Sequence, residues 1–184
     1  MNDRFQCLPL PCPQTNADHG LRAAEWLAAR GILPDGSKRY EQHVHNTMLD
    51  VAAMANCAAL GADPYQLRPV SHWARFSRER HMRKFNSEVV RQGFEIDDWS
   101  RLPGEPGLVV LFHDFGFTRQ EDISPKTIAL RDLAKRHTGA YEGWQVELDR
   151  HELDQGCQPL ITGNHVRIGV ALGHRRNRLK TLIE

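Results

Sequence analysis

Residues 140–149 read Ala-Tyr-Glu-Gly-Trp-Gln-Val-Glu-Leu-Asp and follow a helix-like segment that ends at Gly139. Val146 and Leu148 alternate with polar residues, which is the pattern of a strand with one buried face. Trp144 is in phase with both, and Gly143 before it permits a sharp entry into the strand. The stretch therefore predicts a helix-to-strand junction and a buried Trp144.

Working outward, the same kind of pattern places three more strands and two helices before this strand. Residues 69–76, 94–96 and 108–112 are strand-like, and 108–112 is the most strand-like run in the chain. Ser77 is predicted to cap a helix that Gly93 closes, and Ser124-Pro125 to cap the helix that ends at Gly139. The order is typical of an α+β, ferredoxin-like βαββαβ antiparallel sheet with both helices on one face. We expect 108–112 to be a central strand, covered on one side by four helical residues: Phe85, Val89, Ile128 and Leu133.

The sequence divides into four regions. Residues 1–17 contain Pro9, Pro11 and Pro13 and are predicted to be a flexible arm. Residues 18–68 form a helical N-terminal part, with helices expected over 18–30 and from Tyr40 to Ala58. Residues 69–150 form the ferredoxin-like core. Residues 151–184 form a C-terminal extension with an additional strand-like segment at 165–172 and a short basic amphipathic end.

Composition indicates a globular, cytoplasmic protein without a membrane segment. The chain has 184 residues, of which 40% are hydrophobic and 26% charged, and no run of about 18 apolar residues occurs. The first residues lack the pattern of a secretory signal. A net charge of +1 gives no field that implies a nucleic-acid or membrane partner. Without a signal, reduced thiols are expected: Cys57 reads as a core residue, whereas pairing of Cys7 with Cys12 stays open.

Histidines are the main candidates for chemistry. Glu41 and His45 could share a helix face, but a zinc site needs three or four ligands, so His43 and His45 read as solvated helix residues. His113-Asp114 ends a strand without a nucleophile motif, which favours a structural role over catalysis. We find no phosphate-binding loop or other catalytic motif. The sequence therefore predicts a protein that is not an enzyme and holds neither cofactor nor metal.

Several segments resemble the regulator of ribonuclease E activity B family. Gly61-Ala62-Asp63-Pro64, Val70-Ser71-His72-Trp73 and residues 91–96 are similar to its successive motifs, and residues 133–144, ending in Tyr-Glu-Gly-Trp, are similar to its closing helix and strand. The resemblance covers about residues 45–148. It implies a protein that binds an endoribonuclease, or its RNA-degrading assembly, and inhibits it without chemistry of its own.

The chain departs from the acidic character of that family. Between residues 70 and 150 it has as many Lys and Arg as Asp and Glu. Two acidic pairs, Asp97-Asp98 and Glu121-Asp122, are candidates for contacting basic partner segments. Asp97-Asp98 is expected where the second strand leaves the sheet, and Glu121-Asp122 just before the Ser124 cap, where the helix dipole favours acids.

Direct RNA binding is the alternative function. It would use the sheet face, where Trp73, Phe115 and Trp144 are candidate stacking residues, together with four basic tail residues: Arg175, Arg176, Arg178 and Lys180. The third strand lacks the RNA-recognition signature, and aromatic residues in strands more often serve packing.

Overall fold

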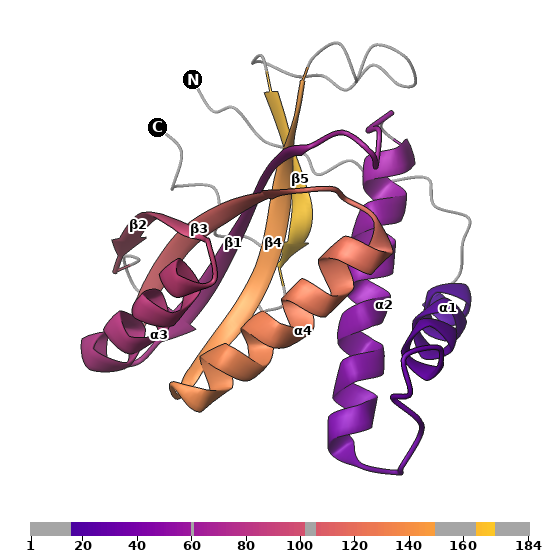
Figure 1. The fold of residues 1–184 in the computed structure, drawn as a ribbon, viewed down its shortest axis with the longest axis horizontal. Helices are drawn as coiled ribbons and strands as arrows, with labels where there is room; N and C mark the ends of the chain where they lie inside the picture. Colours follow the sequence, from indigo (N-terminus) through magenta and orange to yellow (C-terminus); the bar gives the residue numbers. More distant parts are fainter. Residues whose placement is uncertain (1–15, 60, 102–105, 150–164, 172–184) are drawn as a thin grey trace.

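The structure is a computed structural model that describes residues 16–59, 61–101, 106–149 and 165–171. Figure 1 shows the arrangement of its helices and strands. In chain order they are α1 Asn16–Ala28, α2 Lys38–Ala59, β1 Arg68–Phe76, α3 Glu79–Arg91, β2 Glu95–Ser100, β3 Leu108–Gly116, α4 Gln120–Arg136, β4 Gly139–Asp149 and β5 His165–Ala171.

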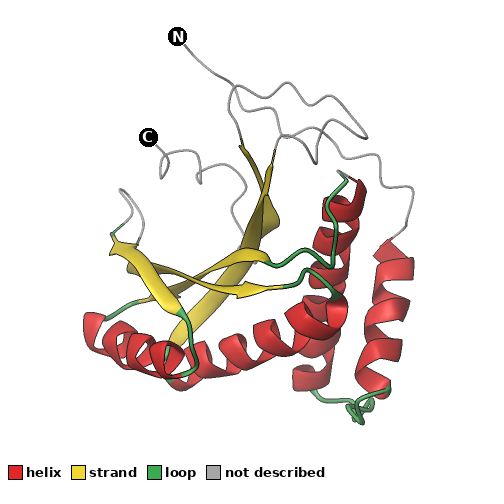
Figure 2. Cartoon of the chain, turned by 45° about the horizontal axis from the view of Figure 1, so that its top comes forward, coloured by secondary structure: helices red, strands yellow, loops and turns green. Residues whose placement is uncertain are grey.

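The five strands form one antiparallel sheet in the order β2-β3-β1-β4-β5. The β1-α3-β2-β3-α4-β4 portion is the predicted ferredoxin-like unit, with α1 and α2 before it. The strand-like segment near the C-terminus is also confirmed, because β5 pairs with β4 from Gly143↔Ala171 to Asp149↔His165. Figure 2 shows the helices gathered on one side of the sheet.

The main core lies between the sheet and helices α3 and α4. β3 is interior, since it pairs with β2 on one side and β1 on the other. Its residues Leu108, Val110 and Phe112 point to the helical face, as the two-residue period of a strand requires. Phe85, Val89 and Leu133 belong to the same core cluster, which confirms their predicted position. Ile128 is only half-buried, and Leu130 packs in the core instead.

A second core cluster lies under α2. It joins Ala53 and Cys57 of α2 to Ile123 of α4 and to Trp144 and Val146 of β4. Cys57 is buried in this cluster, so its predicted role as a small core residue is confirmed. Cys7 and Cys12 lie outside the described residues.

Helix α1 packs on α2 through the face that carries Leu27, and not through the face that carries Leu21. Ala23 and Leu27 are fully buried and His19 is nearly so, whereas Leu21 is 62% exposed. Residues 19, 23 and 27 are four apart and form one helical stripe. Leu21 therefore lies on the solvent-facing side of α1.

Two predicted helix starts were also wrong. Helix α3 begins at Glu79 after Arg78 and makes no side-chain cap, so Ser77 is not its cap. Helix α4 begins at Gln120, before the Ser124-Pro125 pair. Asp122 accepts a 2.6 Å bond from Arg119, and Ile123 is fully buried, so local bonding and packing start this helix early. Pro125 lies past the first turn, where its missing N–H leaves the carbonyl of Glu121 without its usual helical partner; Glu121 is exposed, so water can bond to that carbonyl instead.

The junction between α4 and β4 depends on two residues. Thr138 adopts the left-handed backbone conformation that ends the helix, with φ of 57°. Gly139 is already part of β4, and a Cβ added there would lie 2.2 Å from Cε1 of Phe76. Gly139 therefore serves close packing rather than the turn. Trp144 is fully buried, as predicted.

Candidate functional site

Asp97 and Asp98 lie inside β2, at the edge of the sheet. The expectation that they mark the point where the strand leaves the sheet was wrong, because β2 continues to Ser100 with a register shift between Ile96 and Asp98. An extra residue at this shift bends an edge strand and re-aims its side chains. Glu95, Asp97 and Asp98 are all exposed. We call these three residues the acidic edge.

The acidic edge is built around His113 of β3. The His113 Nδ1 atom lies 2.7 Å from Oδ1 of Asp97, and its Nε2 atom lies 3.9 Å from Glu95. The ring of His113 also meets Phe115 edge-on, with 6.0 Å between centroids. These contacts hold Asp97 in place on the exposed surface.

Two large exposed aromatic residues lie on the same two strands, but on opposite faces of the sheet: Phe115 contacts His113, whereas Trp99 pairs with Val110 of the helical face. Trp99 on β2 is 45% exposed and Phe115 on β3 is 60% exposed. Exposed aromatic residues are enriched among the residues that dominate binding energy at protein interfaces, and Trp also attracts arginine through its ring face. The sequence pattern missed Trp99, although its position directly after two acidic residues is a usable signal.

Glu121 and Asp122 lie in the first turn of α4. Arg119 donates a 2.6 Å bond to Asp122 and lies 3.9 Å from Glu121. The Arg119 guanidinium also lies over the rings of Phe117 and Tyr65, at 4.9 Å and 5.3 Å from their centroids. This pair therefore belongs to a different local network from Asp97 and Asp98, and the two predicted pairs do not form one site.

His113 and Asp114 point to opposite faces of the sheet. His113 joins the acidic edge, whereas Asp114 bonds to Lys126 of α4 and lies 3.4 Å from Nε2 of the buried His72. Burial opposes ionisation of Asp114, but the bonds from His72 and Lys126 outweigh it and lower the Asp114 pKa. Burial lowers the pKa of His72, whose Nδ1 lies 2.8 Å from the Tyr141 hydroxyl. An acid–base pair made of His113 and Asp114 is therefore ruled out by geometry.

A buried polar network centres on Asp50 of α2. Asp50 is fully buried and accepts bonds from Nε1 of Trp144 at 2.9 Å and from the Thr127 hydroxyl at 2.6 Å. Its nearest cation is Arg131 of α4, at 3.8 Å. Burial raises the pKa of Asp50, while Arg131 and the two bonds oppose that shift. The network ties α2, α4 and β4 together.

The aromatic residues proposed for RNA stacking are not equivalent. Trp144 is fully buried on the helical face and Trp73 is 8% exposed, so neither offers a free ring face. Only Phe115 of the three is exposed. The basic tail residues Arg175, Arg176, Arg178 and Lys180 lie outside the described residues.

The metal hypothesis gains no support from the geometry. Within the described ranges, no group of three or more His, Cys, Asp or Glu side chains is arranged to hold a metal ion. Instead, His43 lies 3.4 Å from Nε of Arg39 on the next turn of α2.

A helix that is long and apolar enough to cross a membrane is also absent from the described part of the chain.

Comparison with known proteins supplies an independent observation. The family model described as regulator of ribonuclease activity B matches residues 49–146, more than half of the chain. The match runs from α2 to β4, so it includes the acidic edge and the first turn of α4. No curated protein sequence matches the chain.

Proposed function

Because the chain belongs to the regulator of ribonuclease activity B family, we propose that it binds and inhibits an endoribonuclease of the ribonuclease E type. The family consists of non-catalytic regulators. The match over residues 49–146 is the observation that carries this proposal. The protein would act in the cytoplasm, where RNA turnover takes place, by contact with the enzyme or its RNA-degrading assembly.

The acidic edge is the contact surface that we propose for this partner. It combines exposed carboxylates on the edge strand β2 with the exposed ring of Phe115 on the neighbouring strand β3, which contacts His113. The exposed ring of Trp99 lies on the same edge strand but toward the helical face. An RNA-binding enzyme segment is rich in Arg and Lys, which fits acids and aromatic rings together. Glu121 and Asp122 would be a second, smaller contact, because Arg119 already occupies Asp122.

The proposal is tested with purified protein and a purified ribonuclease E-type enzyme. The protein should slow cleavage of a single-stranded RNA substrate, and its association rate with the enzyme should fall as salt rises. Asp97→Lys with Asp98→Lys should slow association at least severalfold, because rim charges act mainly on the association rate.

A control variant separates surface charge in general from the acidic edge. Glu25→Lys with Glu79→Lys makes the same change in net charge on the exposed surfaces of α1 and α3. It should leave association nearly unchanged. Equal slowing by both double variants would show that net charge, and not the acidic edge, governs capture. Failure of the unmodified protein to bind or inhibit would overturn the proposed function itself.

A further inference from the structure

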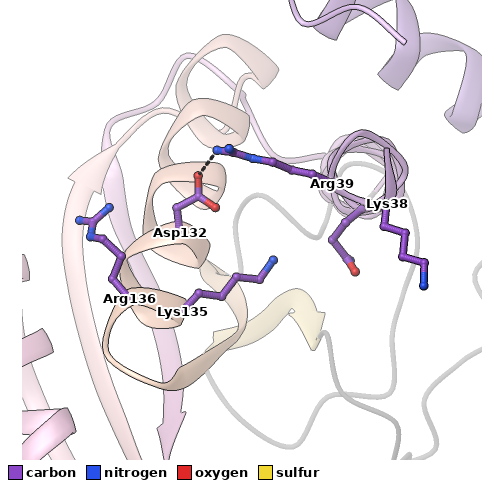
Figure 3. Close-up of a pocket in the computed structure, with 6 residues that line it drawn as sticks. Lys38, Arg39, Asp132, Lys135 and Arg136 are labelled. Atoms are coloured by element: carbon purple, nitrogen blue, oxygen red, sulfur yellow. Dashed lines mark hydrogen bonds and ion pairs between the residues drawn. The ribbon is translucent and has the colours of Figure 1, made fainter. Parts of the chain in front are cut away.

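A hollow on the helical side of the molecule lies between the start of α2 and the C-terminal half of α4. It has a volume of about 650 Å³ and is lined by Lys38, Arg39, Gln42, Asp132, Lys135 and Arg136. Figure 3 shows Arg39 reaching from α2 to Asp132, and Lys135 extending from α4 toward α2. We call these six residues the basic recess. A smaller hollow of about 180 Å³ shares Gln42 and Lys135 with it and adds Asn46, Arg131 and residues 139–141.

Positive charge dominates both hollows. Asp132 is the single carboxylate among their lining residues, and Arg39 already bonds to it at 3.3 Å. Within the described part of the chain, neither Lys38 nor Lys135 makes an ion pair. The neighbouring His43 responds to this charge: its pKa is lowered by burial, and Arg39, Lys135 and Arg131 lower it further, against the opposing effect of Asp132.

Arg131 is the least satisfied group in this region. It is 7% exposed and lines the smaller hollow, yet none of its three guanidinium nitrogens has a hydrogen-bond partner among the described residues. Asp50 supplies opposite charge at 3.8 Å but no hydrogen bond. A buried donor that lacks an acceptor costs on the order of 1–3 kcal/mol. An anion entering the smaller hollow would supply the missing acceptors, directly or through water.

The helix dipoles do not account for all of these cations. Lys135 and Arg136 lie in the last turn of α4, where cations are favourable. Lys38 and Arg39 lie in the first turn of α2, where the positive end of the dipole disfavours them. Ser37 caps this helix start, because its Oγ accepts a bond from the Tyr40 N–H at 3.1 Å, so the unfavourable cations Lys38 and Arg39 are the feature that a bound anion would stabilise.

We propose that the basic recess binds phosphate groups of an RNA backbone. Its lining offers Lys, Arg and Gln side chains, which are groups that proteins use on phosphates. The recess itself has no aromatic or apolar lining residue, so it offers neither a base-stacking platform nor an anchor pocket of the kind that protein partners use. Binding is therefore independent of base sequence and depends strongly on salt.

The test measures binding of the full chain to a short fluorescein-labelled single-stranded RNA at several salt concentrations. Lys38→Gln with Lys135→Gln removes two phosphate contacts, so affinity should fall severalfold. The plot of log affinity against log salt should flatten by about 1.4, from roughly 0.7 for each lost contact. Arg80→Gln with Lys84→Gln, two exposed cations of α3, is the matched control and should change neither value.

Two further measurements separate this site from other sources of binding. The first neutralises four tail residues together: Arg175, Arg176, Arg178 and Lys180. In this background, Lys38→Gln with Lys135→Gln should still flatten the plot of log affinity against log salt by the same amount. RNA should also shift the NMR signal of the Arg131 side-chain Nε–H, which reports on the smaller hollow without mutation.

Four outcomes would overturn the proposal. The first is that the Lys38/Lys135 variant binds RNA as tightly as the unmodified protein, and the second is that the α3 control loses as much affinity as that variant. The third is that neutralising the tail cations alone removes all RNA binding. The fourth is that a polyglutamate peptide binds through the recess as tightly as RNA does. The last of these would assign the recess to an acidic protein segment. No ribonuclease is present in this assay, so its result is independent of whether the protein inhibits one.

Discussion

The Asp50–Arg131 pair gives the sharpest test of how this fold is held together. The perturbation is Asp50→Asn, which keeps the side-chain shape and an oxygen that accepts the bond from Trp144. The Thr127 hydroxyl can rotate to accept a bond from the new amide. The substitution therefore removes only the negative charge of Asp50, which lies 3.8 Å from Arg131. The side chain of Arg131 is 7% exposed.

The expected cost follows from that burial. Removing one partner of a buried ion pair leaves an uncompensated charge and costs about 3–5 kcal/mol. Arg131 cannot escape by losing its proton, because guanidinium groups stay charged in proteins. Against a typical unfolding free energy of about 5–15 kcal/mol, the variant should fold but be clearly weakened.

The reciprocal variant, Arg131→Met, should cost less near neutral pH. Asp50 can take up a proton when its counter-charge is gone, since burial already raises its pKa. A raised native pKa contributes stability that is complete below the unfolded value of about 3.8 and is lost as pH rises through the native value. The deficit of Arg131→Met relative to the unmodified protein should therefore shrink as pH is lowered.

Urea unfolding followed by far-UV circular dichroism gives the free energies for both single variants and for the double variant. The double variant should recover at least about 2 kcal/mol relative to Asp50→Asn, because it replaces the ion pair with neutral groups of similar size. A loss below about 1 kcal/mol for Asp50→Asn, or a larger loss for Arg131→Met, would refute the reasoning.

Four further substitutions probe the packing and the buried histidine. Trp144→Ala should cost about 3–5 kcal/mol in urea unfolding, as for a large core aromatic residue, and a loss below about 1 kcal/mol would contradict its packing role. Gly139→Ala should lower the unfolding free energy by about 1–3 kcal/mol, because the new Cβ overlaps Phe76. Gly20→Ala is the control: its new Cβ would lie 3.9 Å from Met48 Sδ, so it should raise the unfolding free energy by about 0.5–1 kcal/mol by stiffening α1. Equal effects of the two substitutions would exclude the proposed overlap. Burial lowers the native pKa of His72 below 6.5, so stability is complete above that value and falls as pH drops toward the native pKa. The slope of unfolding free energy against pH below 6.5 should therefore be shallower in His72→Gln, and an unchanged slope would mean that folding does not shift the pKa of His72.

Periodicity predicted the elements of the fold because it reports burial directly. In the strand that contains Trp144, the alternation between a buried and an open face is visible in the sequence. The strand at 108–112 was recognised instead by its unbroken run of strand-favouring apolar residues, Leu-Val-Val-Leu-Phe. Helix starts were harder to predict. The start of α4 depends on the Arg119–Asp122 bond and on burial of Ile123, which outweigh the local preference of Ser124-Pro125 for a cap.

The candidate sites depend on contacts between residues far apart in sequence, so the sequence predicted only part of them. Asp97 and Asp98 were identified by charge, but their partner His113 is brought to them by strand pairing across a register shift. Asp50 was missed, although it occupies core spacing with Thr47, Val51 and Met54 on α2, and a carboxylate within such a stripe predicts a buried partner. Arg131 was missed because a charged residue in a helix ordinarily faces solvent.

The two proposed surfaces lie at different ends of the molecule, and this separation has a consequence for regulation. The acidic edge is on β2 at one side of the sheet, whereas the basic recess is formed by α4 and by α2, the helix that also contacts β5 at the other side. The smaller acidic pair is also distant from the recess: along α4, Glu121 and Arg136 are about 22 Å apart at roughly 1.5 Å per residue. That exceeds the screening length of about 8 Å at physiological ionic strength, so Glu121 has little effect on binding at the recess. Under the two proposals, an enzyme docked at the acidic edge leaves the basic recess open to phosphates of the RNA that the enzyme holds. The protein would then oppose cleavage by contacting enzyme and substrate together, which a purely acidic surface cannot do because it repels the RNA backbone.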